Sequence, residues 1–87
     1  LSLANILNLM GSSDNNTLTI SSGAGGNTLS IDDNGGVSLG SVNSASIASA
    51  LSATDNGLSG GYYEFGIAGG TLLIEQNLID VGNTNIL

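Results

Sequence analysis

None of the 87 residues is lysine, arginine or histidine, whereas seven are Asp or Glu, so the formal net charge is −7. Salt bridges between side chains therefore cannot form, and the fold must be held by buried apolar side chains and by hydrogen bonds. The same absence excludes binding to nucleic acids or to anionic membrane surfaces through cationic side chains. No apolar run reaches the length of a membrane span, so we expect no membrane insertion.

The chain also lacks cysteine, which removes disulfides and, together with the missing histidine, zinc sites. Its length predicts a single domain covering residues 1–87. Small domains with a limited core commonly gain stability from disulfides, a metal ion or oligomerisation. We therefore expect association with other copies, or a hard cation bound by oxygen ligands.

A short alternating motif recurs along the chain. Residues 16–20 read Asn-Thr-Leu-Thr-Ile, and residues 27–31 repeat this pattern as Asn-Thr-Leu-Ser-Ile. The motif returns in residues 71–74 and, more weakly, in residues 83–86. Alternation of aliphatic and hydroxyl side chains is typical of half-buried strands. The repeats predict stacked strands, although β-propensity alone produces similar patterns.

Turn residues suggest how these strands connect. Asn34-Gly35 is a strong hairpin signal, and Val37 and Leu39 alternate after it, which predicts a three-strand meander or the coils of a short solenoid. Residues 62–67 alternate again, and Gly69-Gly70 predicts a second hairpin.

Folding at Gly69-Gly70 sets Ile67 opposite Leu72 and Phe65 opposite Ile74. It also sets Glu64 opposite Glu75, an unfavourable pairing of like charges. A further strand is expected over residues 78–81.

Two segments are ambiguous. Residues 1–10 fit both helical and strand spacing, and their Asn-rich composition favours an extended segment, either a core strand or a strand donated to a neighbour. Residues 42–53 predict one short helix, capped by Ser41 or Asn43 and ending before Gly57, although a strand also fits. The predicted fold class is mainly β, as a meander, small sandwich or solenoid completed by strand stacking between chains.

Few residues could carry chemistry. Without His, Cys or Lys, only carboxylates remain as acids or bases, and Glu64 with Glu75 is the one candidate pair. We therefore expect no enzymatic activity. Asp32 and Asp33, followed by Asn34, form an oxygen-rich cluster that is a candidate calcium site, although these are also common turn residues. No other cofactor is expected, and the sequon at residues 15–17 is taken as incidental.

Residues 23–31, which read Gly-Ala-Gly-Gly-Asn-Thr-Leu-Ser-Ile, loosely resemble the calcium-binding nonapeptide of RTX β-rolls. That resemblance implies calcium held by oxygen ligands in Gly-rich turns. The match covers one copy of the motif, and Asn27 or Thr28 stands where the family has Asp.

Composition and pattern lead to one main functional hypothesis. About half of the residues are Ser, Thr, Asn or Gly, and the chain starts at Leu1 without a basic leader, which indicates a processed, secreted chain. We expect a structural subunit of an extracellular, self-assembling filament of the functional-amyloid or pilus type, with copies of itself as partners. The alternatives are a β-rich adhesin or calcium-dependent surface module and, third, a shell component.

Overall fold

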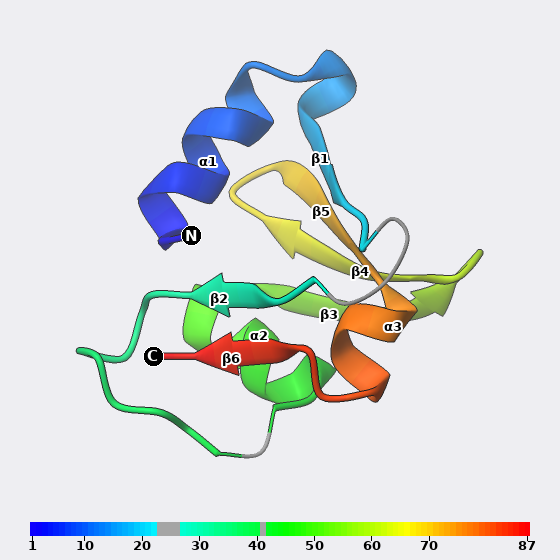
Figure 1. Ribbon diagram of the computed structural model, residues 1–87. Coiled ribbons are helices and arrows are strands. Elements are labelled where there is room, and N and C mark those ends of the chain that lie inside the picture. The colour runs from blue at the N-terminus through cyan, green and yellow to red at the C-terminus, as the bar shows by residue number, and fades with distance from the viewer. Residues whose placement is uncertain (23–26, 41) are drawn as a thin grey trace.

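Six short strands form two sheets, and three α-helices pack against them, in the residues that the computed structural model describes, 1–22, 27–40 and 42–87 (Figure 1). The elements in chain order are α1 (Leu3–Gly11), the 3-10 turn η1 (Asp14–Asn16), β1 (Thr17–Ile20), β2 (Leu29–Ile31), α2 (Ser44–Leu51), β3 (Thr54–Ser59), β4 (Tyr62–Ile67), β5 (Gly70–Glu75), α3 (Gln76–Asp80) and β6 (Thr84–Ile86). The protein is thus a small α/β domain, and the prediction of a mainly β fold is confirmed only in part. None of these helices is long and apolar enough to span a membrane.

The larger sheet has the strand order β1-β5-β4-β3. Its three later strands are joined by two-residue hairpin turns, Gly60-Gly61 and Ala68-Gly69, in which every residue has a positive φ. Two positive φ angles are what a type I′ turn requires, and such turns suit the twist of paired strands. The second hairpin was predicted, whereas the first was missed.

The register of the β4–β5 hairpin differs from the prediction by two residues. The turn lies at Ala68-Gly69, so Phe65 pairs with Leu72, and Glu64 pairs with Leu73. Because side chains alternate with a period of two, this shift leaves every side chain on its expected face. The predicted opposition of Glu64 and Glu75 is wrong.

The four copies of the recurring motif pair two by two as parallel strands. In the larger sheet β1 lies beside β5 with Leu18 opposite Leu72, and in the smaller sheet β2 lies beside β6 with Ile31 opposite Ile86. Parallel neighbours need long crossover connections, so adjacent copies in sequence cannot pair directly in this way. The three-strand meander predicted around Asn34-Gly35 is therefore wrong, and the copies meet across the domain. The consecutive strands β3, β4 and β5 do form an antiparallel meander.

A turn does form after β2, but its centre lies one residue later than the predicted Asn34-Gly35. Gly35 and Gly36 have positive φ, and the main-chain nitrogen of Val37 donates to the oxygen of Asn34 at 3.1 Å. The segment after this turn does not pair with β2, however, because both hydrogen-bonding edges of β2 are already occupied. Leu1 bonds to one side through Ser30, and β6 occupies the other.

Two of the helices, α1 and α3, form where strands were expected, and the third, α2, confirms an expected helix. The first segment is the helix α1, not a strand, with Ser2 and Asn5 forming a reciprocal capping box. Helix α2 confirms the short helix predicted near residues 42–53, with Asn43 as its cap. The strand predicted at 78–81 is wrong, because Leu78 and Ile79 belong to helix α3.

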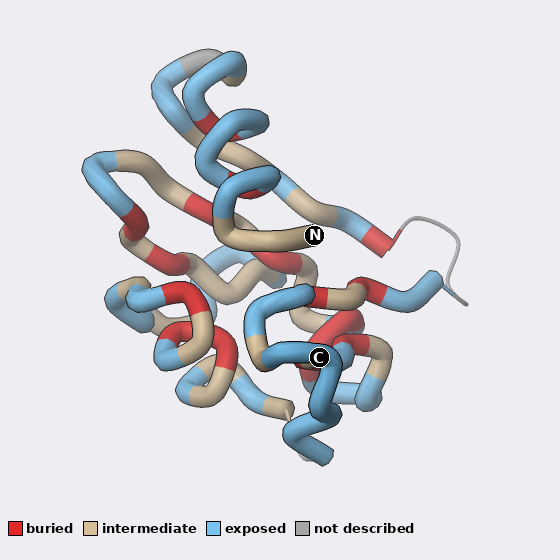
Figure 2. Tube along the Cα trace, turned by 90° about the vertical axis from the view of Figure 1, so that its left-hand side faces the viewer, coloured by how far each residue is buried: buried red, intermediate tan, exposed pale blue. Residues whose placement is uncertain are grey.

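Buried positions lie along both the helices and the strands (Figure 2). The buried side chains of α1, Ile6 and Met10, belong to the same hydrophobic cluster as Phe65 and Leu72 of the larger sheet. Because Phe65 pairs with Leu72, both residues lie on one face of that sheet, and buried side chains of the other helices and of the smaller sheet belong to this cluster too. The opposite face carries the intervening residues of β4 and β5, which are only partly buried.

Candidate functional site

A pocket lies between the loop after β2 and helix α2, beside β6. Its volume is about 410 Å³. Asp33, Asn34 and Leu39 line it from the loop. Ser46, Ser49 and Ala50 line it from α2, and Ile86 lines it from β6. This volume falls in the range of small-molecule sites, roughly 300–1,000 Å³.

Local turn chemistry shapes the loop wall of this pocket. The main-chain nitrogens of Asp33 and Asn34 both donate to the oxygen of Leu87, at 2.8 and 2.6 Å. The Asn34 amide also donates to the oxygen of Val37 at 2.7 Å, and Leu39 donates to the oxygen of Ile86 at 3.1 Å. The bonds to Leu87 and Ile86 attach both ends of the loop to the end of β6 and the residue after it, so the pocket has a defined wall.

The two candidate calcium ligands diverge. Asp33 lines the pocket, whereas the Asp32 side chain is 64% exposed and lies 3.5 Å from the main-chain nitrogen of Leu1. Within the described residues, no group of three or more Asp, Glu, His or Cys side chains is placed to hold a metal ion. Calcium at Asp32 and Asp33 therefore stays a prediction, and the resembling nonapeptide begins in residues 23–26, which lie outside the described part.

Glu75 and Ser22 form a close carboxylate–serine contact at the ends of β5 and β1. One carboxylate oxygen of Glu75 accepts from the Ser22 nitrogen at 2.7 Å and from its hydroxyl at 2.6 Å. The hydroxyl bond, followed by the main-chain bond, holds the pKa of Glu75 below its ordinary value, against a smaller opposite effect of burial. Ser22 is only 4% exposed, so this contact tethers a buried group.

A second polar cluster lies between β4 and α3. The hydroxyl of Tyr63 donates to Asp80 at 2.6 Å, and the Gln76 amide donates to the other oxygen of Asp80 at 2.8 Å. The hydrogen bond from Tyr63, followed by that from Gln76, lowers the pKa of Asp80. The bond to Asp80 in turn raises the pKa of Tyr63, with lesser contributions from burial and from the charges of Asp80 and Asp55. This cluster ties α3 to the sheet.

The two carboxylates considered for acid–base chemistry are not directly opposite each other; the register makes them diagonal neighbours on one face of the β4–β5 hairpin. Glu75 pairs across the strands with Tyr62, and Glu64 pairs with Leu73. Glu75 is instead engaged by Ser22. Sequence reasoning missed both the partner of Glu75 and the pocket, because each joins segments that are distant in the chain.

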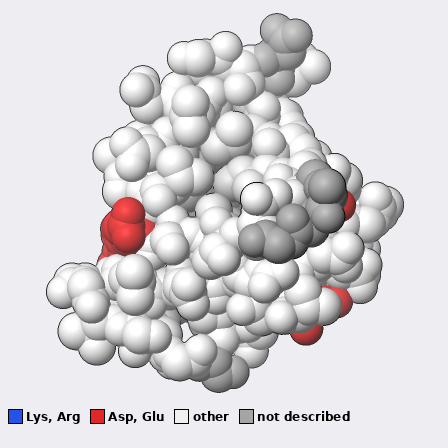
Figure 3. All heavy atoms as spheres, viewed as in Figure 1, with Lys and Arg blue, Asp and Glu red and all other residues white. Residues whose placement is uncertain are grey.

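Acidic groups do not gather into one patch on the face shown in Figure 3. The Asp and Glu side chains visible there lie in separate places, and the surface shows no Lys or Arg. A single strongly acidic binding surface is therefore not a feature of this face.

Comparison with known proteins adds no assignment, because no family model, curated protein or solved structure matches the chain significantly.

Proposed function

We propose that the chain is a non-enzymatic module of an extracellular surface or adhesive protein, and that it works as a folded unit without partner copies. The sequence alone favoured a filament subunit, with an adhesin or surface module as an alternative. We now prefer the surface module. This preference rests on the way the apolar segments are used.

The observation that carries the proposal is the burial of the apolar residues near both ends. Ile6 and Met10 of α1 and Ile86 of β6 belong to one intramolecular core. Strand donation would need at least one of these segments to be extended and available to a neighbour. Their burial places within one chain a part of the apolar surface that was expected to drive assembly, whereas Leu7 and Leu9 on the other side of α1 stay exposed.

The strand edges give the second support. The edge strand β3 has an irregular register between Asp55 and Leu58, and the nitrogen of Gly57 donates to the Asp55 carboxylate at 2.9 Å. Bulges and charges on an edge strand discourage pairing with another chain. The other edge, β1, is only four residues long. Neither edge offers a long, regular template for stacking.

Sedimentation velocity over a wide range of protein concentration tests the proposal. A single species of monomer mass, at neutral pH with and without calcium, is the expected result. A polymer that sediments at all concentrations would reject the proposal. It would support the filament instead, which remains the alternative proposal together with copies of the chain as partners.

Electron microscopy of the same samples separates the two proposals further. Because stacked copies would concentrate seven uncompensated negative charges per chain, filaments should form faster near pH 4 or with added salt. A module of the proposed kind should stay dispersed and folded in high salt at neutral pH. Filaments under those conditions would count against it.

A further inference from the structure

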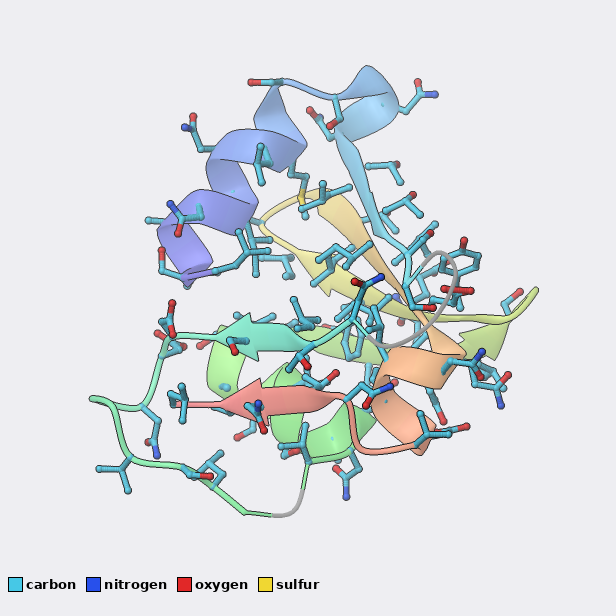
Figure 4. The ribbon with its side chains drawn as sticks, in the orientation of Figure 1. Atoms are coloured by element: carbon cyan, nitrogen blue, oxygen red, sulfur yellow. The ribbon has the colours of Figure 1, made fainter. Side chains whose placement is uncertain are left out.

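We infer that the pocket between the 33–39 loop and α2 binds a pyranose sugar unit, with a preference for amino sugars over uronic acids. This inference deepens the proposed function, because it rests on the chain being a surface module that meets carbohydrate. The side chains in question belong to the region between β2, β6 and α2 (Figure 4).

The free hydrogen-bonding groups of the pocket are mostly acceptors. One N–H of the Asn34 amide is used by Val37, which leaves its second N–H and its oxygen, and the Asp33 carboxylate can only accept when ionised. The Ser46 hydroxyl is bonded to the main chain of Asn43, to which it donates at 2.9 Å. Among the described residues, the Ser49 hydroxyl has no partner, and it can both donate and accept. A ligand that fits must therefore bring a hydrogen-bond donor for Asp33 and can also bring acceptors for Asn34 and Ser49.

Charge and apolar surface narrow the class of ligand. Among the described residues that line the pocket, Asp33 alone is charged, and the sequence has no cationic side chain to attract an anion. Leu39, Ala50 and Ile86 add aliphatic surface. A pyranose combines hydroxyl donors around its edge with an apolar C–H face, so it matches both parts of the lining. A bare metal ion would use the carboxylate but not the aliphatic surface.

The same groups predict an order of affinity among sugars. An amino sugar presents an ammonium group to Asp33 and gains a charge-assisted hydrogen bond, whereas a uronic acid meets the carboxylate with a like charge. No aromatic side chain lines the pocket, so stacking is missing. We therefore expect dissociation constants of about 1 mM, near the weak end of specific binding.

Nuclear magnetic resonance titration of the ¹⁵N-labelled protein tests this order directly. Methyl glucoside, glucosamine and glucuronate are added in separate experiments, each with EDTA and again with calcium. Glucosamine should shift the amides of residues 33–39 and 46–50 at lower concentration than methyl glucoside, and glucuronate should leave them unchanged. Unchanged spectra with all three sugars, or equal shifts with glucuronate, overturn the inference.

Two variants place the sugar in the pocket. Ala50→Phe fills the pocket from α2 and should abolish the shifts, whereas Ala45→Phe makes the same change at an exposed position of the same helix and should preserve them. If Ala50→Phe does not fold, Asp33→Asn decides, because it should remove the preference for glucosamine over methyl glucoside. An Asp33→Asn protein that keeps this preference contradicts the inference.

Failure of the sugar site can be distinguished from failure of the proposed function. Calcium that shifts the pocket amides while no sugar does so rejects the sugar and supports the calcium site at Asp32 and Asp33. Flat sugar titrations of a monomeric protein reject only the sugar site, whereas sedimentation as polymer rejects the surface module itself.

Discussion

The side chain of Met10 occupies the space that a Cβ atom on Gly70 would need, and the main-chain oxygen of Asn16 would lie only 2.8 Å from that atom. Gly70 does not have a positive φ, whereas Ala68 and Gly69 do. The expected reason for this glycine, a left-handed turn, is therefore wrong. Glycine is needed here because α1 and the chain before β1 approach the start of β5 closely.

Gly70→Ala should lower the free energy of unfolding by about 1–3 kcal/mol, the usual range for an overpacked contact. Gly70→Val should cost more, since the side chain is larger. Gly11→Ala is the matched control, because a Cβ there meets open space, and it should change stability by less than about 1 kcal/mol. Urea denaturation measures both. Equal stabilities of Gly70→Ala and the unchanged protein would show that α1 does not pack on β5 as described.

Ile6→Ala should destabilise the domain by about 2–5 kcal/mol, because Ile6 is fully buried in the core. Leu9→Ala, on the exposed side of the same helix, should cost about 0.5 kcal/mol or less, since Leu9 is 46% exposed. Thermal and urea unfolding give both values. Similar small losses for the two variants would mean that α1 is not part of the core, and would revive a role of this segment between chains.

Acid should weaken the domain through Glu75. Its pKa is lowered in the folded state, so the stabilisation is fully present above the ordinary value of 4.5 and is lost as the pH falls through the folded value. The urea concentration at the midpoint of unfolding should therefore decrease as the pH falls below about 4.5. In Glu75→Gln this decrease should be smaller. Glu64→Gln is the matched control, because it removes a carboxylate that accepts no hydrogen bond from the described residues. If stability falls equally with pH in Glu75→Gln and in the unchanged protein, the hydrogen bonds between Ser22 and Glu75 are not the cause of the loss of stability in acid.

Sequence reasoning succeeded where the signal is carried by adjacent residues. The helix near residues 42–53, the alternation of β4 and the turn near Gly35 all depend on neighbours in the chain. Capping, alternation and positive φ are local properties, so they can be predicted without the partner segments. The same reasoning located the faces of the β4–β5 hairpin even though its register was two residues off.

The errors concern the pairing of strands and the element type of two short apolar segments, α1 and α3. Val37 and Leu39 follow a turn that lies one residue beyond the predicted one, but β2 already has neighbours on both sides, so no hairpin forms. Leu78 and Ile79 are apolar enough for a strand, yet they form a helix whose apolar side chains join the core. Short apolar runs do not distinguish helix from strand, and burial against other elements decides between them.

The candidate pocket and the contact between Glu75 and Ser22 also depend on contacts between segments that are distant in the chain. Ser22 and Glu75 are 53 residues apart in the chain, and the pocket joins Asp33, α2 and Ile86. The sequence by itself determined that no side-chain salt bridge could form, where turns were favoured and which strand faces were apolar. Only the tertiary structure decided which copies of the repeated motif lie side by side and where a pocket remains. Those outcomes depend on packing between distant segments, and local propensity carries no information about which segments meet.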